Sequence, residues 1–541
     1  MANMRTLIRI VFVIFIANGI DCIGSDICCN FSKYENIIKD GNITVESLVN
    51  NNWYNAKENL VLMIFKKEDD NDVFTSEGNG EKISFKLDKN NNSKIVYQNE
   101  NEDKLKLEDP LNLKEKKYAF FEIKTKGGNT VYLYCSDVES IKKTNGIFEG
   151  TTHISISVIA CNTTEVTDMG YMLYGCSNLE NLKFGENFNT ENVEDMKWMF
   201  TDCKNLTKLE FGENFNTINV TNMEGMFSGC SSLKELDLKI FNTINVTDMR
   251  DMFSFCTNLI KIDFGQKFNT KNVTDMEGMF EHCRKLINLD LKNFNTTNVT
   301  NMNFMFYDCN SLTELNLQNF NTTNVRQMSF MFSKCSSLKE LVFGENFNTA
   351  NINDMNSMFY ECSNLTELDL KNFNTSNVEN MGSIFYGCSS LTKLNLKNFN
   401  TTNVKHIGRM FKNCSNLTEL EFGENFNTIN VTNMAYMFSD CKELTKLDLK
   451  NFNTSNVTDM MYMFSECSSL TKLKFGENFN TKNVTDMEYM FSGCSSLTKL
   501  GFIENFNTKN VKNMEGMFEN CKKLSKDTIS KILNNNQITT K

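Results

Sequence analysis

The stretch NVTDMMYMFSEC, residues Asn456–Cys467, decides the fold because it recurs along the chain with small changes. Its closing cysteine marks fourteen repeats, each 26 or 27 residues after the last: Cys176, Cys203, Cys230, Cys256, Cys283, Cys309, Cys335, Cys362, Cys388, Cys414, Cys441, Cys467, Cys494 and Cys521. A fixed period of this length is the signature of a solenoid, in which stacked repeats share one continuous core. The inferences that follow depend on this repeat.

Chain length and charge restrict the class of protein. A chain of 541 residues is too long for one compact core, but a solenoid grows by adding rungs. The net charge of −11 disfavours a polyanionic partner, because phosphate binding needs a clustered basic surface. We therefore expect no nucleic-acid partner.

Residues 1–24 have the features of a secretory signal peptide. Arg5 and Arg9 precede a short apolar run at residues 10–16, and small residues then suit cleavage near Gly19. The apolar run is shorter than the about 20 residues that span a bilayer. We predict a protein that is secreted or displayed on the extracellular cell surface; an uncleaved anchor is the alternative.

The first part of each repeat predicts a short helix or a 3-10 turn. In the quoted stretch the apolar residues follow at spacings of three, three and one, which places them on one helical face: Val457, Met460, Met463 and Phe464. An asparagine at the start, with an aspartate three residues on, resembles a capping box that satisfies free N–H groups.

The second part of each repeat predicts a short parallel strand. In LTKLDL, residues 444–449, Leu447 and Leu449 alternate with the polar Lys446 and Asp448. Stacked strands of this kind build a sheet on one face of the solenoid, and an NFNT segment then closes a turn. Repeats of 27 residues carry the extra residue directly after the strand, so the core positions stay in register.

Methionine, phenylalanine and cysteine at equivalent places in successive rungs predict stripes of buried apolar volume. In two representative rungs this core ladder consists of Met196, Met199, Phe200, Cys203, Met460, Met463, Phe464 and Cys467. The alternative is a soft-metal site, because thioether and thiolate ligands select Cu(I). Ile384 and Ile407 replace methionine and carry no ligand atom, so we favour the core and expect no metal or other cofactor.

The nineteen cysteines divide into two groups. The fourteen repeat cysteines form a ladder about 5 Å apart if neighbouring strands keep normal sheet spacing, and we predict buried free thiols. The other five are the better disulfide candidates in an exported protein, with a connectivity that the sequence leaves open: Cys22, Cys28, Cys29, Cys135 and Cys161.

Over residues 152–524 the patterns M-x-x-M-F-x-x-C-x-x-L-x-x-L-[DN]-L and F-N-T-x-N-V resemble the repeat of the BspA-like leucine-rich repeat surface proteins. The resemblance implies a right-handed α/β solenoid of about 14 rungs, with a parallel strand and a short helix or turn in each. It also implies surface display or secretion, and adhesion to proteins of the matrix or of host or neighbouring cells. This chain has no recognisable wall-sorting signal, which leaves its membrane attachment open.

The predicted solenoid comprises residues 151–524. The regions on either side of it differ from it in composition. Residues 25–150 contain short β-like runs at 60–65, 83–87, 118–123 and 130–135, and predict a small β-rich domain that also shields the first rung. The apolar spacing in residues 525–541 predicts a capping helix and tail. In HISISVIAC, residues 153–161, we expect the first rung.

Catalytic and metal patterns are weak. His282 precedes Cys283, but other rungs have Gly, Asp or Lys at its position, which favours a surface residue over a Cys-His pair. The Asp or Asn before the first repeat methionine forms either a calcium ladder or a cap at the start of a helix, and the variants Gln327 and His406 favour the cap. We expect no catalytic residues, no enzymatic activity and no small-molecule substrate.

The NVT triplets, as at Asn219 and Asn245, are glycosylation sequons if the host is eukaryotic. Because glycans at every rung would crowd, we favour asparagines that bridge turns between repeats.

Two surfaces are candidates for binding. The residue before the second repeat methionine is aromatic in several rungs and forms either an exposed stripe or rings that pack on the next rung: Trp198, Phe304, Phe330, Tyr436, Tyr462 and Tyr489, with Tyr171 at the same position. Outward strand positions line the sheet with mixed charge, which is either a binding face or a solvated one: Glu235, Asp237, Glu367, Asp369, Lys446 and Asp448.

The sequence therefore predicts a nonenzymatic binding or adhesion protein that recognises a protein or glycan of a host or neighbouring cell. The first alternative is a structural, self-associating coat protein. An enzyme is the second, and its active site would have to lie in residues 26–150.

Overall fold

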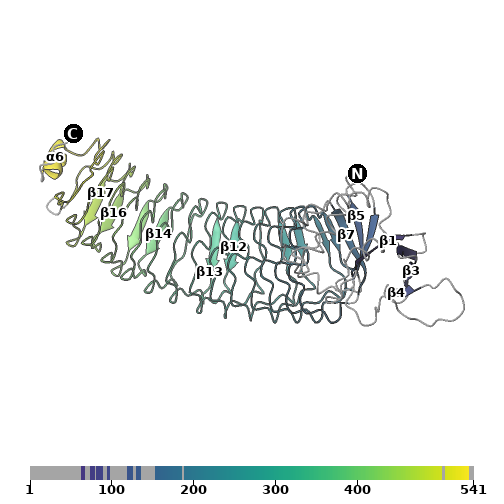
Figure 1. The fold of residues 1–541 in the computed structure, drawn as a ribbon. Helices are drawn as coiled ribbons and strands as arrows, with labels where there is room; N and C mark the ends of the chain where they lie inside the picture. Colours follow the sequence, from purple (N-terminus) through teal and green to yellow (C-terminus); the bar gives the residue numbers. More distant parts are fainter. Residues whose placement is uncertain are drawn as a thin grey trace, which may run out of the picture. The chain divides into compact units, whose positions relative to one another are not determined.

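The computed structural model describes residues 163–185, 188–501 and 506–534, together with the strands between residues 62 and 161. The chain divides into two compact units, residues 1–269 (unit 1) and residues 270–541 (unit 2). Each contains a stretch of β-solenoid with parallel strands and little helix, and together they hold about 12 turns, close to the 14 rungs predicted. Within each unit the rungs lie side by side (Figure 1). The predicted signal peptide and Cys22, Cys28 and Cys29 lie outside the described residues.

Unit 1 contains a nine-stranded sheet with the order β4-β3-β2-β1-β6-β5-β7-β8-β9. Its strands are β1 (Leu62–Lys67), β2 (Val73–Gly78), β3 (Glu81–Asp88), β4 (Lys94–Tyr97), β5 (Ala119–Thr125), β6 (Thr130–Cys135), β7 (His153–Cys161), β8 (Asn181–Lys183) and β9 (Lys208–Glu210). Strands β1 to β7 pair antiparallel, whereas β7, β8 and β9 pair in parallel, as in a solenoid. A further parallel pair, β10 (Glu235–Asp237) and β11 (Lys261–Asp263), follows in this unit.

The N-terminal strands cover the edge of the first rung. Four of them overlap the predicted runs. Strands β2 and β4 were not predicted, because β2 is largely polar and β4 has only four residues. Strand β5 pairs along β7, where Ile156 and Val158 are buried, and Ile156 is in register with Leu182 of the next rung. The expected first rung and its shielding are therefore both present.

The disulfide candidates within this sheet lie too far apart to bridge. Ala119 pairs with Cys135 on one side and with Cys161 on the other. Two strand spacings separate their backbones by about 10 Å, beyond the reach of a disulfide. Cys161 is a free thiol in the structure.

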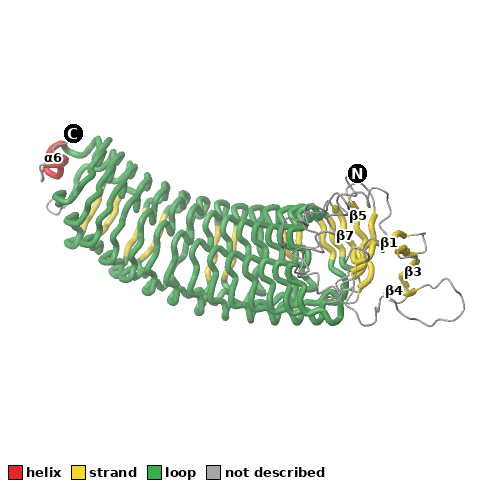
Figure 2. The backbone as a smooth tube through the Cα atoms, in the orientation of Figure 1, coloured by secondary structure: helices red, strands yellow, loops and turns green. Residues whose placement is uncertain are grey.

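Unit 2 has three parallel strand pairs and the one helix of the described residues, which Figure 2 shows against a background of turns and loops. They are β12 (Glu314–Leu317) with β13 (Glu340–Phe343), β14 (Lys393–Leu396) with β15 (Glu419–Phe422), β16 (Lys446–Leu449) with β17 (Lys472–Phe475), and α6 (Lys526–Asn534). The rungs that contain Asp290 and Glu367 have no strand, although Leu291 and Leu370 remain buried there. Strand prediction in these two rungs was therefore wrong.

Helix α6 matches the predicted capping helix. Its N-cap is Ser525, whose Oγ accepts the Thr528 N–H at 3.1 Å. Ile532 and Leu524 are buried, so the helix packs its apolar side on the last rung. Among the described residues, no helix has the length and apolar character that crossing a membrane requires.

Of the two conformations predicted for the first part of each repeat, a short helix or a 3-10 turn, the helix is wrong: this segment is a series of turns. In the quoted stretch the Met463, Ser465 and Cys467 N–H groups each donate to the carbonyl three residues earlier, at 3.2 Å. The N–H groups of the intervening residues donate to the next rung instead, at 2.7–3.0 Å. An isolated helix of eight residues would be only marginally stable. In the stacked rungs, carbonyl groups of the neighbouring rung accept every second N–H of the segment instead.

Two positions in every turn segment have a left-handed backbone. In the quoted stretch they are Tyr462 and Glu466, with φ of 54° and 59°. A helix does not tolerate this conformation, which costs a non-glycine residue about 1–2 kcal/mol. The turns nevertheless direct the same residues inward as the predicted helix would, because Val457, Met460 and Met463 are fully buried.

Identical side chains stack to form the core. All eight residues of the predicted core ladder in the Cys203 and Cys467 rungs are fully buried. The core phenylalanines of successive rungs lie nearly parallel, with ring centroids 5.3–5.8 Å apart within each unit. The methionines and cysteines fill the space beside this stack, where volume rather than metal ligation accounts for them.

Each repeat cysteine also makes a directed bond. From Cys309 onward, with Cys230 and Cys256 in unit 1, the thiol Sγ donates to the core phenylalanine carbonyl of the preceding rung at 3.0–3.2 Å. The same carbonyl accepts the N–H of the cysteine in its own rung. The repeat cysteines are free and buried, as predicted.

A threonine ladder supplies the polar counterpart. The threonine of each FNT segment is fully buried, and its Oγ1 donates to the backbone carbonyl of an asparagine in the next rung. At Thr375 the same Oγ1 also accepts the Asn400 N–H, with both distances 2.9 Å. One side chain therefore satisfies two buried backbone groups.

Replacing Thr375 with valine should lower the free energy of unfolding by about 1–3 kcal/mol, because two buried backbone groups of Asn400 lose their partner while the packed volume is kept. Urea denaturation measures the change. Thr392→Val, at an exposed position, is the matched control and should change stability by less than about 0.5 kcal/mol. Equal effects would show that the ladder bond contributes little.

The buried thiols should make stability fall at alkaline pH. Burial raises the pKa of the Cys414 thiol from 9.0 to about 12, so folding holds it neutral while the unfolded thiol ionises. Its stabilisation is complete below pH 9 and is lost as the pH rises towards 12. Between pH 7.5 and 10 the Cys414→Ser protein should lose about 1.4 kcal/mol less stability than the natural chain. Identical pH profiles in urea denaturation would contradict this.

Candidate binding surfaces

The predicted sheet-face charges are exposed, and three of them, Asp237, Asp369 and Asp448, pair with nearby lysines. Lys239 Nζ lies 2.9 Å from Asp263 and 3.3 Å from Asp237, and Lys474 Nζ lies 3.3 Å from Asp448 in the neighbouring rung. Lys239 thereby lowers the pKa of the Asp263 carboxyl. Exposed pairs of this kind contribute little to stability, and each neutralises charge only locally. This arrangement is typical of a solvated face.

The remaining predicted sheet residues do not form a single patch. Glu235 is exposed on β10 of unit 1, and Lys446 is exposed on β16 of unit 2. Glu367 and Asp369 are exposed in a rung that has no strand, and Asp369 pairs with Lys371 at 2.9 Å. The structure therefore distributes these side chains over both units.

The aromatic residues before the second repeat methionine form the ring column, defined as Tyr171, Trp198, Phe304, Phe330, Tyr436, Tyr462 and Tyr489. Each is half-buried and has positive φ. Their rings stack across rungs: the centroids of Tyr462 lie 4.8 Å from Tyr436 and 5.0 Å from Tyr489. Phe304 and Phe330 stack at 5.0 Å. Of the two alternatives, an exposed stripe or rings that pack on the next rung, the second describes these rings, although each stays partly exposed to solvent.

A second aromatic column was missed by the sequence reading. Tyr307, Tyr360 and Tyr386 follow the core phenylalanine directly and are also half-buried. Tyr360 and Tyr386 stack at 4.6 Å, and Tyr307 contacts both Phe304 and Phe330 of the ring column. The signal was available, because the pentapeptides MFYDC, MFYEC and IFYGC place tyrosine at one repeat position.

Basic side chains complete the surface in unit 2. The Arg409 guanidinium and the Lys412 ammonium lie 5.4 and 4.2 Å from the Tyr436 ring centroid, and Lys334 lies 5.3 Å from that of Tyr307. Burial lowers the pKa of Lys412. We call this surface the aromatic face of unit 2, defined as Phe304, Tyr307, Phe330, Tyr360, Tyr386, Tyr436, Tyr462 and Tyr489.

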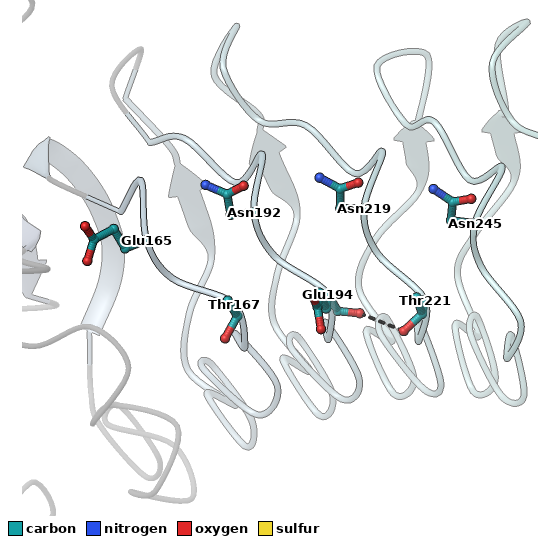
Figure 3. A pocket seen from close by; sticks show the side chains of 7 residues that line it. All are labelled: Glu165, Thr167, Asn192, Glu194, Asn219, Thr221 and Asn245. Carbon is teal, nitrogen blue, oxygen red and sulfur yellow. Dashed lines mark hydrogen bonds between the residues drawn. The ribbon is translucent and has the colours of Figure 1, made fainter.

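Unit 1 has a groove lined by two polar rows. Figure 3 shows Asn192, Asn219 and Asn245 in one row and Thr167, Glu194 and Thr221 in the other, with Glu165 at one end. The asparagine Nδ2 atoms donate to backbone carbonyls of the preceding rung, and the Thr221 Oγ1 donates to the Glu194 carbonyl. The same asparagine bond recurs through unit 2. The asparagine row is therefore part of the scaffold. This agrees with the favoured hypothesis that the asparagines of the NVT triplets bridge turns between repeats.

The residues singled out for metal or catalytic chemistry have structural partners. The Asp or Asn before the repeat methionine accepts the N–H two residues later, as Asp459 does from Met461 at 3.0 Å. This side chain therefore caps a turn. The predicted role as a cap at the start of a helix is wrong. His282 is not a simple surface residue, since its Nδ1 lies 2.8 Å from Asp308 in the next rung. In the described part of the chain, no three acidic, histidine or cysteine side chains gather as metal ligands.

Comparison with known proteins identifies the repeats. The family model described as "Mycoplasma protein of unknown function, DUF285" matches residues 117–234, 180–285, 259–344, 341–443, 421–475 and 448–540. Among curated proteins none matches this chain. The solved structures similar to this chain include a leucine-rich cell surface protein of Faecalibacterium prausnitzii, at 16% identity and a TM-score of 0.29, over 83% of this chain and 95% of that one. Neither name mentions the BspA-like proteins, so that resemblance stays a prediction.

A glycine in the ring column provides a test of the packing. Gly225 has φ of +59°, and an added Cβ would lie 2.4 Å from Cε3 of Trp198. Gly225→Ala should lower the stability of unit 1 by about 1–3 kcal/mol and shift Trp198 fluorescence to longer wavelength, because the ring is pushed outward. The measurement requires Trp53→Phe, which leaves Trp198 as the only tryptophan.

The control for this experiment is Gly408→Ala, where φ is not positive and the added atom meets only ordinary contacts. It should change neither stability nor fluorescence. An unchanged Trp198 spectrum in Gly225→Ala would contradict the packing of the ring on the next rung.

Proposed function

The chain belongs to the family described as "Mycoplasma protein of unknown function, DUF285", and since that description leaves the function open, we propose that it is a nonenzymatic binding protein, secreted or displayed at the cell surface. In this proposal it holds a protein or glycan of a host or neighbouring cell on the aromatic face of unit 2. The signal peptide predicted in residues 1–24 is the basis for an extracellular location.

The observation that carries this proposal is the gathering of half-buried tyrosines on one face. The core consists of phenylalanine, methionine, leucine and cysteine, whereas Tyr307, Tyr360, Tyr386, Tyr436, Tyr462 and Tyr489 all lie at two surface columns of unit 2. Tyrosine combines a large apolar ring with a polar tip and is enriched where binding energy concentrates. Scattered single rings would need no explanation, but these rings form three stacked groups, Phe304–Phe330, Tyr360–Tyr386 and Tyr436–Tyr462–Tyr489.

The scaffold fixes these rings before a partner arrives. All of these rings except Tyr307 stack on a neighbour at 4.6–5.0 Å, and Tyr307 contacts Phe304 and Phe330 edge-on. The backbone beneath is bonded to the next rung. Burial, with a hydrogen bond to Glu488 at 3.2 Å, raises the pKa of Tyr462 to about 12, so its hydroxyl stays protonated. A surface ordered in advance loses little conformational entropy on binding.

The alternative, a self-associating coat, uses the same rings to join copies of the chain. Size-exclusion chromatography separates the two proposals. A monomer at all concentrations that binds cells supports the binding function, whereas concentration-dependent filaments support the coat.

Replacing Tyr436, Tyr462 and Tyr489 with serine should weaken binding of the purified chain to cultured animal or bacterial cells at least about tenfold, because anchor rings of this kind contribute 2 kcal/mol or more each. Serine occupies the same repeat position at Ser357 and Ser383, so the fold accommodates it. Flow cytometry with labelled protein measures binding.

The matched control replaces Lys446, Asp448 and Lys472 on the sheet face with serine. It should bind cells as the natural chain does. Unchanged binding by the tyrosine variant, or equal loss in the control, would exclude the aromatic face as the binding surface.

A further inference from the structure

Four successive rungs of unit 2 depart from the repeat at several surface positions at once. Most rungs have a Thr-Asx-Met sequence that leads into the turn segment, often followed by glutamate, as in TDME at 274–277 and 485–488. The four departing rungs read RQMS at 326–329, NDMN at 353–356, ENMG at 379–382 and KHIG at 405–408. The leading threonine is absent from all four, and the core position stays apolar, with Ile407 in place of methionine in the last of them.

A hollow of ≈ 300 Å³ lies on these rungs. It is lined by Asn303, Gln327, Ser329, Asn353, Asp354, Glu379, Asn380, Lys405 and His406. At the repeat position of Gly382 and Gly408, the two rungs that flank these four carry Asn303 and Ala435, and more distant rungs carry glutamate, as at Glu277 and Glu488. Neither glycine has positive φ, and a Cβ on Gly408 would meet only ordinary contacts, so the backbone does not require glycine there. The effect of the two glycines is to leave room.

The lining is polar and nearly neutral. Lys405 Nζ pairs with Glu379 Oε2 at 2.7 Å. The Asp354 carboxylate accepts the Asn356 N–H at 2.7 Å and the Asn380 Nδ2 at 3.4 Å, so it is partly satisfied by the protein. A strongly charged ligand would meet no matching charge here, and a peptide side chain would find no apolar lining. Four amides, a hydroxyl and an imidazole line the hollow. The Asn303 and Asn380 Oδ1 atoms each accept one backbone N–H, and each oxygen has a second lone pair for a ligand donor.

We propose that this hollow binds a neutral, hydroxyl-rich glycan. Every sugar hydroxyl both donates and accepts, which matches a wall of amide, carboxylate and imidazole groups. The hollow adjoins the aromatic face, because Phe304 and Phe330 directly follow Asn303 and Ser329 in the chain and stack at 5.0 Å. Aromatic surface next to convergent polar groups is the usual composition of a ligand site.

The rung spacing favours an extended oligosaccharide over a single sugar. Stacked strands repeat about every 4.8 Å, which is close to the length of one sugar ring in an extended chain. Successive sugars laid along the rungs therefore meet amides in successive rungs, from Gln327 and Asn353 to Asn380. The inference rests on the proposed function and names the chemistry of the partner.

The test refills the hollow with the residue that other rungs carry. The double variant Gly382→Glu, Gly408→Glu places glutamate at the repeat position of Glu277 and Glu488. An added Cβ meets only ordinary contacts at Gly408, whereas at Gly382 it lies 3.1 Å from the Asn356 Oδ1 and 3.3 Å from the Asn380 Oδ1, so these two side chains must shift slightly. Met461→Glu makes the same change at the same repeat position outside the hollow and is the control. All three full-length chains are applied to an array of defined neutral oligosaccharides, and the strongest array glycan is titrated calorimetrically.

The natural chain and Met461→Glu should bind the array, and the double variant should bind its strongest glycan at least about tenfold more weakly. Equal binding by the double variant would overturn the assignment of the hollow. Circular dichroism confirms that the variants fold.

Cell binding separates failure of this inference from failure of the proposed function. Mild periodate, which cleaves the vicinal diols of sugars, should abolish binding of the natural chain to cells. Binding that resists periodate but is lost after trypsin treatment of the cells would indicate a protein partner, which overturns the glycan while the binding function stands. Absence of binding to both array and untreated cells would overturn both.

Discussion

The structure depends on one constraint, which is that the backbone of each rung is satisfied by the next. In the turn segment every second N–H, such as those of Met460, Tyr462 and Phe464, donates to a carbonyl one rung away. A buried backbone group without a partner costs as much as a lost hydrogen bond, so a rung is not stable alone. Stacking is therefore the condition under which the turns, the strands and the core exist.

This constraint also explains the composition of the interior. Stacked backbones bring identical positions to within one strand spacing, so each side chain meets a copy of itself. Phenylalanine rings then stack face to face, the buried threonine bonds the asparagine backbone of the next rung, and the cysteine thiol bonds the phenylalanine carbonyl of the preceding one. Methionine and cysteine are buried here beside the phenylalanine stack, where flexible and small apolar side chains fill the gaps between rungs.

Side chains that point outward do not have to pack against a copy of themselves in the next rung. The rungs therefore differ from one another at these positions. The scaffold holds Tyr462 and Ser357 at the same place with the same backbone, since both have positive φ. Surface chemistry can therefore change from rung to rung without disturbing the fold. The aromatic face of unit 2 and the polar hollow beside it are two such local departures on one regular frame.

The sequence by itself determined the solenoid, the register of its rungs, the inward residues such as Met460 and Cys467, and the position of the ring column, because spacing and repetition are one-dimensional properties. It did not determine that the methionine segment is a run of turns. A spacing of three and four brings residues to one side in either conformation, and only the carbonyls of the next rung decide where the N–H groups donate. It also did not reveal the second tyrosine column, the Asp308 partner of His282 or the hollow around Asn380. These features arise between residues about 26 positions apart, which become neighbours only when the rungs stack.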